Sequence, residues 1–507
     1  MRTPKTDRQA AAGPHYWPLA AALVLFAVVV WLLPLRELDL AVYWRAAQQV
    51  FVAGTEPYTR AEDAGLPFTY PPTALFLLQP LAGLTLAQAA DLLWCLNLAL
   101  AVLVMLLLPR DLAHMPVGAA FLPRPEPRSE PNHSDRGQRP LSQQARPVGA
   151  AFLPRPEPPA PQIAARRLRT WGPLYIACFG GLYLTLHFHQ VNLLLLLCLW
   201  GFWRVLRLSR PGPPARGPGR LAAGAALALG SVAKPHYGLL LLGTLGCLRA
   251  GRRPGPGLWL LLGAVLGGVA LLWASIAVAP AGSWAAWWAQ VPGTTSFTAL
   301  PPGHSSIAAP WNRSIAGEVA RWLVPNKFTE PLVASPAAAG LITTALVLGL
   351  ALATGRAVLA SVLLRARRCT AGTGGADPVA VDLELSLLAL WVFLAAPASW
   401  THHLVLLLPA ALVLLRDAVL DPRAGGLGRL AAVLVLAVLA LTLDDLIPRE
   451  VRTGSRAIMA LMTVAVLGLW ALLLERLLRH TAASRQDPAG AAPDLPSGAA
   501  PDVRAST

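Results

Sequence analysis

Apolar runs long enough to cross a bilayer recur from one end of this chain to the other, and they constrain its fold more than any other feature. A membrane-spanning helix needs about 20 predominantly apolar residues, and the first run, residues 17–35, reaches that length. Only 13% of the residues are charged and 55% are hydrophobic, whereas soluble domains carry about 25% charged residues. We therefore expect an all-α polytopic membrane protein, a bundle of about 12 transmembrane helices (roughly 11 to 13). The later runs lie near residues 88–109, 171–186, 190–207, 221–248, 258–280, 338–362, 383–398, 402–416, 429–446 and 456–474.

The positive charge is distributed as the orientation of membrane spans requires. The net charge is +16, but the arginines gather in short clusters between apolar runs, in the pattern of the positive-inside rule. Because Arg2, Lys5 and Arg8 precede the first run, we expect both termini in the cytoplasm and the protein in the cell (plasma) membrane. Membrane orientation accounts for the charge, so nucleic acid is not an expected partner. The clusters are Arg166, Arg167 and Arg169; Arg204, Arg207 and Arg210; Arg249, Arg252 and Arg253; and Arg365, Arg367 and Arg368.

The chain divides into one membrane domain with polar flanks and no separate soluble domain. The predicted units are a cytoplasmic N-terminus (1–16), a polytopic membrane domain (17–475) and a disordered cytoplasmic tail (476–507).

A polar segment, residues 110–170, interrupts the membrane domain. It is rich in Pro and Arg, and the same twelve-residue sequence occurs in it at 116–127 and 147–158. Two copies this short cannot bury a core, so we predict a disordered cytoplasmic insertion. A cytoplasmic insertion requires an odd number of crossings between 71 and 109, so residues 71–84 are predicted to be re-entrant or to lie in the membrane interface.

No cofactor or metal site is expected. The five cysteines are scattered without CxxC or Cys/His pairing, and no HExxH, Asp-x-Asp or Walker A sequence occurs. The nearest acidic pairs, Asp382 with Glu384 and Asp444 with Asp445, have no histidine beside them, so a metal site is weakly supported.

Polar residues from distant segments fall on the non-cytoplasmic side of this predicted topology. Asp39 follows the first span, residues 187–192 form the apex of a helical hairpin, and Asn312 and residues 400–403 lie in or beside later outer segments. No nucleotide pool is expected on that face, so a lipid-borne substrate is the more consistent one. Glycosyl transfer needs a group that removes the acceptor proton, and Asp39 is the candidate base. The alternative is an ordinary solvated acid in a juxtamembrane loop.

Two further groups can support such chemistry. An imidazole of His402 or His403 can assist the base or hold a donor phosphate. The alternative is that both pack as interfacial histidines beside Trp400. Lys234 lies within the apolar run 221–248, where an ammonium must find an anion or reach water. A lipid phosphate would satisfy Lys234, and snorkelling to the interface is the alternative. Pro235 frees a helical carbonyl, which predicts two half-helices meeting at Lys234.

Seven short segments, in order over roughly residues 17–475, together resemble glycosyltransferase family 87, which groups GT-C class polyprenyl-phosphate-mannose-dependent α-mannosyltransferases. The family usually has Gly before the Gln of Gln190-Val191-Asn192, where this chain has His189. The segments are Asp39 to Tyr43; Gly54 to Tyr58; Tyr70-Pro71-Pro72 with Pro80-Leu81-Ala82; Gln190-Val191-Asn192; Lys234-Pro235; Asn312-Arg313-Ser314; and Ser399 to His403.

The resemblance implies a GT-C-like bundle that acts on the outer membrane face. It implies an inverting hexosyltransferase that moves a hexose, such as mannose, from a polyprenyl-phosphate sugar donor to a lipid or glycan acceptor. Asp39 would be the general base and His402 a second catalytic residue. The residues it implies for donor or acceptor binding are Tyr43, Tyr58, Tyr70, His189, Gln190, Asn192, Lys234, Asn312 and His403.

A transporter or flippase of a lipid or anionic solute is the alternative class, with Lys234 and Asp39 on a substrate or proton path. Transporters often show two-fold internal similarity, and no second copy of the Tyr-Pro-Pro or His-His segments occurs. A structural scaffold, the third reading, leaves the polar residues of the outer face unexplained.

Overall fold

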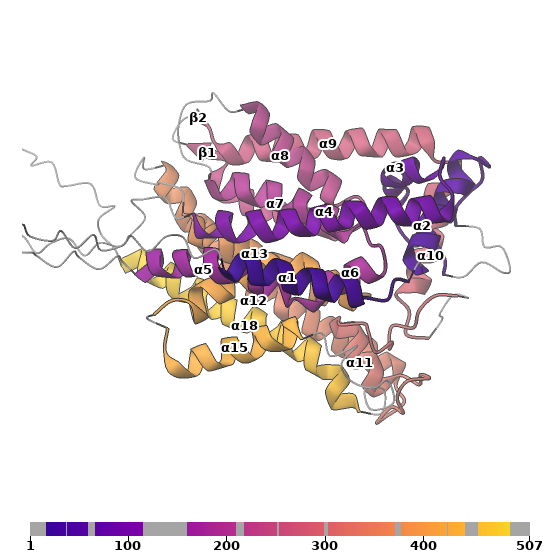
Figure 1. Cartoon of the computed structure of the whole chain (residues 1–507). Helices are drawn as coiled ribbons and strands as arrows, with labels where there is room; N and C mark the ends of the chain where they lie inside the picture. Colours follow the sequence, from indigo (N-terminus) through magenta and orange to yellow (C-terminus); the bar gives the residue numbers. More distant parts are fainter. Residues whose placement is uncertain are drawn as a thin grey trace, which may run out of the picture.

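The computed structural model describes residues 17–36, 38–58, 66–114, 160–208, 217–250, 253–298, 303–370, 377–422, 424–441 and 455–486. Long helices run side by side through the molecule, and the short helices α2, α3, α10 and α11 gather at one end, on the right of Figure 1. The first half of the chain forms α1 (Trp17–Leu32), α2 (Leu38–Phe51), η1 (Pro72–Ala74), α3 (Leu75–Leu78), η2 (Gln79–Leu81), α4 (Leu86–Ala113), α5 (Ala160–Ala177), α6 (Gly180–His187), α7 (Asn192–Leu208), α8 (Gly217–Gly230) and η3 (Pro235–Cys247).

The second half is also helical. A two-residue antiparallel ribbon, β1 (Arg249–Ala250) and β2 (Arg253–Pro254), turns the chain at the other end of the bundle (Figure 1). The helices that follow are α9 (Pro256–Val278), α10 (Ser283–Thr294), α11 (Ile315–Leu323), α12 (Pro336–Thr370), α13 (Pro378–Ala395), η4 (Thr401–Leu407), α14 (Leu408–Leu414), η5 (Leu415–Val419), α15 (Gly426–Ala440) and α18 (Arg456–Gln486).

The helical, membrane-spanning character predicted from the sequence is confirmed, but the number of about 12 spans is not. Within the described residues, six helices are long and apolar enough to cross a membrane. One predicted run, 171–186, is divided between α5 and α6, and the run 221–248 is divided at Lys234 as expected. The break between α6 and α7 falls at the predicted hairpin apex. The six are Leu86–Ala113, Pro256–Val278, Pro336–Arg368, Pro378–Ala395, Thr401–Val419 and Arg456–Arg485.

The predicted boundaries of the polar segments also differ from the helices observed. Helix α4 continues to Ala113 and α5 begins at Ala160, so both ends of the 110–170 segment are helical, while residues 115–159 lie outside the described part. Helix α18 continues beyond residue 475 to Gln486, because its apolar face keeps packing on α12 and α13. Residues 72–81 form only short helices and, like the predicted first span, Trp17–Leu32, they are not among the six. Asp444 and Asp445 lie outside the described residues.

The centre of the bundle consists of α13 and the helical segment 401–419. Nearly all their side chains are buried against neighbouring helices, whereas α9 exposes most of its surface. The Asp382–Glu384 pair lies within this centre, fully buried and matched with arginines. Asp382 accepts hydrogen bonds from Arg207 Nε (3.0 Å) and Arg416 Nη1 (2.7 Å), and Glu384 accepts from Arg365 Nε (3.0 Å). These acids therefore hold helices together at the start of α13. Because each residue of helix rises about 1.5 Å, they lie about 20 Å from the end of α13.

Helices α8 and α9 pack closely because small residues face each other. A Cβ on Gly263 would overlap the Leu221 carbonyl oxygen, whereas a Cβ on Gly268, on the same helix, would meet nothing. Small residues at helix contacts let backbones approach in membrane bundles.

We expect Gly263→Ala to lower the free energy of unfolding by about 1–3 kcal/mol, because the added methyl group forces the two helices apart. The measurement is the unfolding of the detergent-solubilised protein, monitored by circular dichroism. Gly268→Ala is the matched control and should be neutral or slightly stabilising. Equal destabilisation by both variants would contradict the close α8–α9 contact.

Candidate active site

A chain of hydrogen bonds begins at Asp39, in the first turn of α2. Gln190, in the break before α7, donates from Nε2 to Asp39 Oδ2 and accepts at Oε1 from the Tyr43 hydroxyl (2.7 Å). Tyr43 lies one helical turn after Asp39, so both side chains reach the same amide. The Gln190 amide thus fixes the orientation of a half-buried carboxylate.

Aromatic side chains extend this chain of contacts. The hydroxyls of Tyr43 and Tyr70 lie 3.0 Å apart, and the Tyr58 hydroxyl donates to the Tyr70 carbonyl oxygen at 2.8 Å. Phe68 packs between Tyr58 and Tyr70, with ring centroids 5.6 and 5.7 Å away. The structure therefore brings together Asp39 and four of the predicted binding residues, although they come from three segments separated by up to 151 positions.

The environment of Asp39 favours proton transfer near neutral pH. Burial raises the pKa of its carboxyl to about 6, and the Gln190 hydrogen bond and the positive charge of Lys234 limit that rise. A base whose pKa lies near the working pH combines a large ionised fraction with a useful affinity for the proton.

Lys234 and the two histidines form the second half of the cluster. The predicted break is present: α8 ends at Gly230, and Lys234 occupies the position before η3 in a non-helical conformation. Lys234 Nζ lies 2.7 Å from His403 Nε2, and both side chains are buried. The His402 ring meets the His403 ring edge-on, with centroids 4.4 Å apart. Lys234 is therefore held inside the protein and does not snorkel to the interface.

Backbone contacts position the segment 187–192. The Arg36 N–H donates to the His187 carbonyl oxygen (2.9 Å), and the Thr185 hydroxyl donates to the His402 carbonyl oxygen (3.0 Å). His189 is the one described non-glycine residue with a positive φ, 52°. A left-handed conformation favours glycine, and glycine is what the family resemblance implies there.

Asn192 and Asn312 differ in what their amides contact. Asn192 is buried, and its Oδ1 has no hydrogen-bond partner among the described residues. Asn312 is fully occupied: Nδ2 donates to the carbonyl oxygens of Ile307 and Pro397 (2.9 Å each), and Oδ1 accepts from the N–H groups of Ser314 (3.2 Å) and Ser399 (2.9 Å). Its amide has no capacity left for a substrate, so Asn312 acts by joining two segments of the chain.

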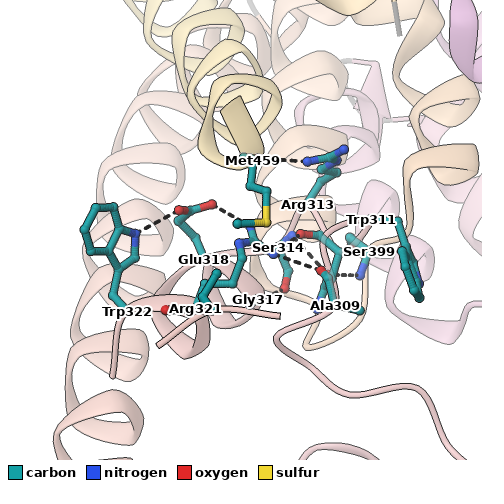
Figure 2. A network of polar contacts seen from close by, with 12 residues as sticks. Ala309, Trp311, Arg313, Ser314, Gly317, Glu318, Arg321, Trp322, Ser399 and Met459 are labelled. Carbon is teal, nitrogen blue, oxygen red and sulfur yellow. Dashed lines mark hydrogen bonds and ion pairs between the residues drawn. The ribbon is translucent and has the colours of Figure 1, made fainter. Parts of the chain in front are cut away.

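Figure 2 shows a network of polar contacts in which Trp311, Arg313 and Ser399 lie close together. The Arg313 N–H donates to the Ser399 carbonyl oxygen (2.7 Å), and Arg313 Nη1 donates to the Met459 carbonyl oxygen (2.8 Å). The Thr401 hydroxyl donates to the Trp311 carbonyl oxygen (3.0 Å). This network fixes the residues that lead directly into His402.

Sequence reasoning did not identify the positioning roles of Thr185 and Arg313. Thr185 had a weak signal, since it is a polar residue inside an apolar run. Arg313 adjoins the predicted Asn312 and is 3% exposed, an unusual burial for an arginine.

The comparisons with known proteins give one match. The model of glycosyltransferase family 87 matches residues 68–397, more than half of the chain. No curated protein and no solved structure matches. The matched region includes Tyr70, Gln190 and Lys234, whereas Asp39 precedes it and the two histidines follow it.

Proposed function

Because this chain belongs to glycosyltransferase family 87, a family of membrane glycosyltransferases, we propose that the cluster around Asp39 is the site of sugar transfer from a polyprenyl-phosphate donor. The transferred sugar is a hexose, such as mannose, and the acceptor is a lipid or a glycan. The reaction takes place on the outer face of the cell membrane, with both termini in the cytoplasm. The family does not favour the transporter alternative.

The observation that carries the proposal is the presence of a half-buried carboxylate and a buried cation in one cluster. Asp39, held by Gln190, and Lys234, held by His403, come from sequence-distant segments and lie close enough to interact electrostatically. Buried charges are costly unless they are functional or compensated. A carboxylate suits the acceptor hydroxyl, and an ammonium suits a phosphate.

The chemistry assigns one task to each half of the cluster. Asp39 removes the proton of the acceptor hydroxyl while that oxygen forms a bond to the anomeric carbon. The bond between the anomeric carbon and the phosphate oxygen breaks, and its electron pair leaves with polyprenyl phosphate. Lys234 stabilises the negative charge that develops on this leaving phosphate. Attack opposite the leaving group inverts the anomeric configuration.

The direct test is to incubate the purified protein in lipid nanodiscs with a panel of polyprenyl-phosphate sugars. We expect release of polyprenyl phosphate that depends on an added acceptor. Release from no donor in the panel, with folded protein, would contradict the proposal.

Lys234→Met is expected to weaken donor binding about tenfold to a hundredfold, because a charge-assisted contact is typically worth about 1.5–3 kcal/mol. Donor Kd in nanodiscs is the measurement. Arg356→Met, which removes an exposed cation from α12, is the control and should bind donor normally. An unchanged donor Kd for folded Lys234→Met would remove Lys234 from the donor site.

A further inference from the structure

A cavity of about 630 Å³ lies among the loops that follow α10 and surround α11. Its volume falls within the range of small-molecule sites, about 300–1,000 Å³. Residues from the stretches 296–298 and 303–328 supply its described lining, together with Leu66. None of the residues assigned above to catalysis or donor binding lines it.

The lining combines aromatic faces with hydroxyl-sized polar groups. The Trp311 side chain is 42% exposed and meets the ring of Phe328 edge-on, with centroids 5.6 Å apart. The same lining includes the hydroxyl-bearing residues Ser296, Thr298, Ser305 and Ser306 and the imidazole of His304. A pyranose ring has the complementary character, because its C–H groups form an apolar face and its hydroxyls form a polar rim.

The charge of the lining limits the ligand further. Lys327 is the one cation in it, with Nζ 5.3 Å from the centre of the Phe328 ring, and the described lining residues include no carboxylate. A cationic ligand is therefore disfavoured. An acyl chain is also disfavoured, because it would displace water from the hydroxyl and imidazole groups and could not replace the hydrogen bonds that they lose.

Both walls of the cavity connect to the proposed active site. On one side, the Trp311 carbonyl oxygen accepts from the N–H and the hydroxyl of Thr401, the residue before His402. On the other side, the Leu66 carbonyl oxygen accepts from Arg45 Nη2 (3.4 Å), and Arg45 lies on α2, which carries Asp39. The cavity thus adjoins the two segments that hold the catalytic residues.

We infer that this cavity binds the acceptor, and that the acceptor is a saccharide whose ring packs on Trp311. The inference rests on the proposed function, because it takes the cluster at Asp39 as the place of transfer. It narrows the acceptor from a lipid or a glycan to a glycan or a glycosylated headgroup, held with a hydroxyl directed toward the site.

Sugar binding is tested first, without donor. Saturation-transfer NMR of the protein in nanodiscs, with methyl glycosides of mannose, glucose and galactose and with hexose disaccharides, should show transfer to ring C–H protons. Trp311→Ala should reduce that signal, Trp311→Phe should restore most of it, and Trp288→Ala should leave it unchanged. Trp288 is 60% exposed on α10 and does not line the cavity.

Transfer kinetics provide the second arm. Trp311→Ala should raise the acceptor KM about tenfold, the effect of losing a well-packed aromatic contact, with turnover at saturating acceptor and donor Kd unchanged. Glycosides should be better acceptors than octanol or dialkylglycerol. No sugar signal with the wild-type protein, or equal use of dialkylglycerol and glycosides, would overturn the inference. Sugar binding at Trp311 without any release of polyprenyl phosphate would instead overturn the proposed function.

Discussion

Replacing Asp39 with asparagine is expected to slow sugar transfer by about 10²–10⁴-fold, the usual cost of removing a general base. Asparagine keeps the size of the side chain and can still accept the Gln190 hydrogen bond, so the fold and donor binding should persist. Single-turnover transfer and donor Kd, measured on the same preparation, separate the two effects.

Asp91→Asn is the matched control, because Asp91 is an exposed acid on α4, outside the cluster. It should transfer sugar at the wild-type rate, whereas His402→Ala should be impaired. Near-normal transfer by a folded Asp39→Asn protein would remove the base from the mechanism and leave Asp39 with only a structural role, as the partner of Gln190 at the start of α2.

The raised pKa of Asp39 adds a pH signature to the same prediction. The base acts only when ionised, and burial holds its pKa at about 6. The single-turnover rate of the wild-type protein should therefore rise about tenfold per pH unit below about 6. The residual rate of Asp39→Asn should not follow this profile. A wild-type rate independent of pH between 5 and 7 would argue against Asp39 as the titrating group.

Asp382→Asn is expected to destabilise the protein by about 3–5 kcal/mol. This substitution removes the carboxylate that Arg207 pairs with, whereas Arg416 keeps its second partner, Asp417. A buried charge left without its partner is strongly unfavourable. The amide can still accept from Trp203 Nε1, which lies 3.0 Å from Asp382 Oδ1, so the loss reports mainly on charge. Reversible unfolding in mixed detergent micelles gives the free energy.

Glu475→Gln is the control for this measurement. Glu475 pairs with Arg479 on α18, but both side chains are largely exposed, and such a surface pair contributes at most about 0.5 kcal/mol. A loss for Asp382→Asn no larger than that of Glu475→Gln would contradict a structural role for the buried pair.

The helical class and several breaks followed from the sequence alone because they depend on local chemistry. The apolar run 88–109 corresponds to α4 (Leu86–Ala113). The run 221–248 is interrupted at Lys234-Pro235, where the proline predicts a break in the helix. The number of spans could not be predicted, because one continuous apolar run can contain two shorter helices and hydropathy does not show the break between them. The three segments α5, α6 and α7 occupy sequence that was expected to hold two spans.

The site could be predicted by residue type but not by arrangement. A hydropathy pattern shows which polar residues lie inside or at the ends of apolar segments, and it therefore identifies Asp39, Gln190, Lys234 and His403 as candidates. The hydrogen bonds between these residues depend on how distant segments pack together. Tyr43 and Gln190, for example, are more than 140 positions apart in the sequence. For the same reason the sequence did not reveal that neighbouring segments use all the hydrogen-bonding capacity of the Asn312 amide.

The buried ion pair of Arg207 and Asp382 has a consequence for biosynthesis. The two residues are 175 positions apart, and at about 5–20 residues per second a ribosome needs roughly 10 to 35 seconds to make that length. During this interval Arg207, at the end of α7, has no carboxylate from α13 to neutralise it, and a lone guanidinium does not enter hydrocarbon cheaply. Arg207 can therefore stay in water at the membrane surface while the helices before it are made, and the arrival of α13 is the event that lets this arginine become buried.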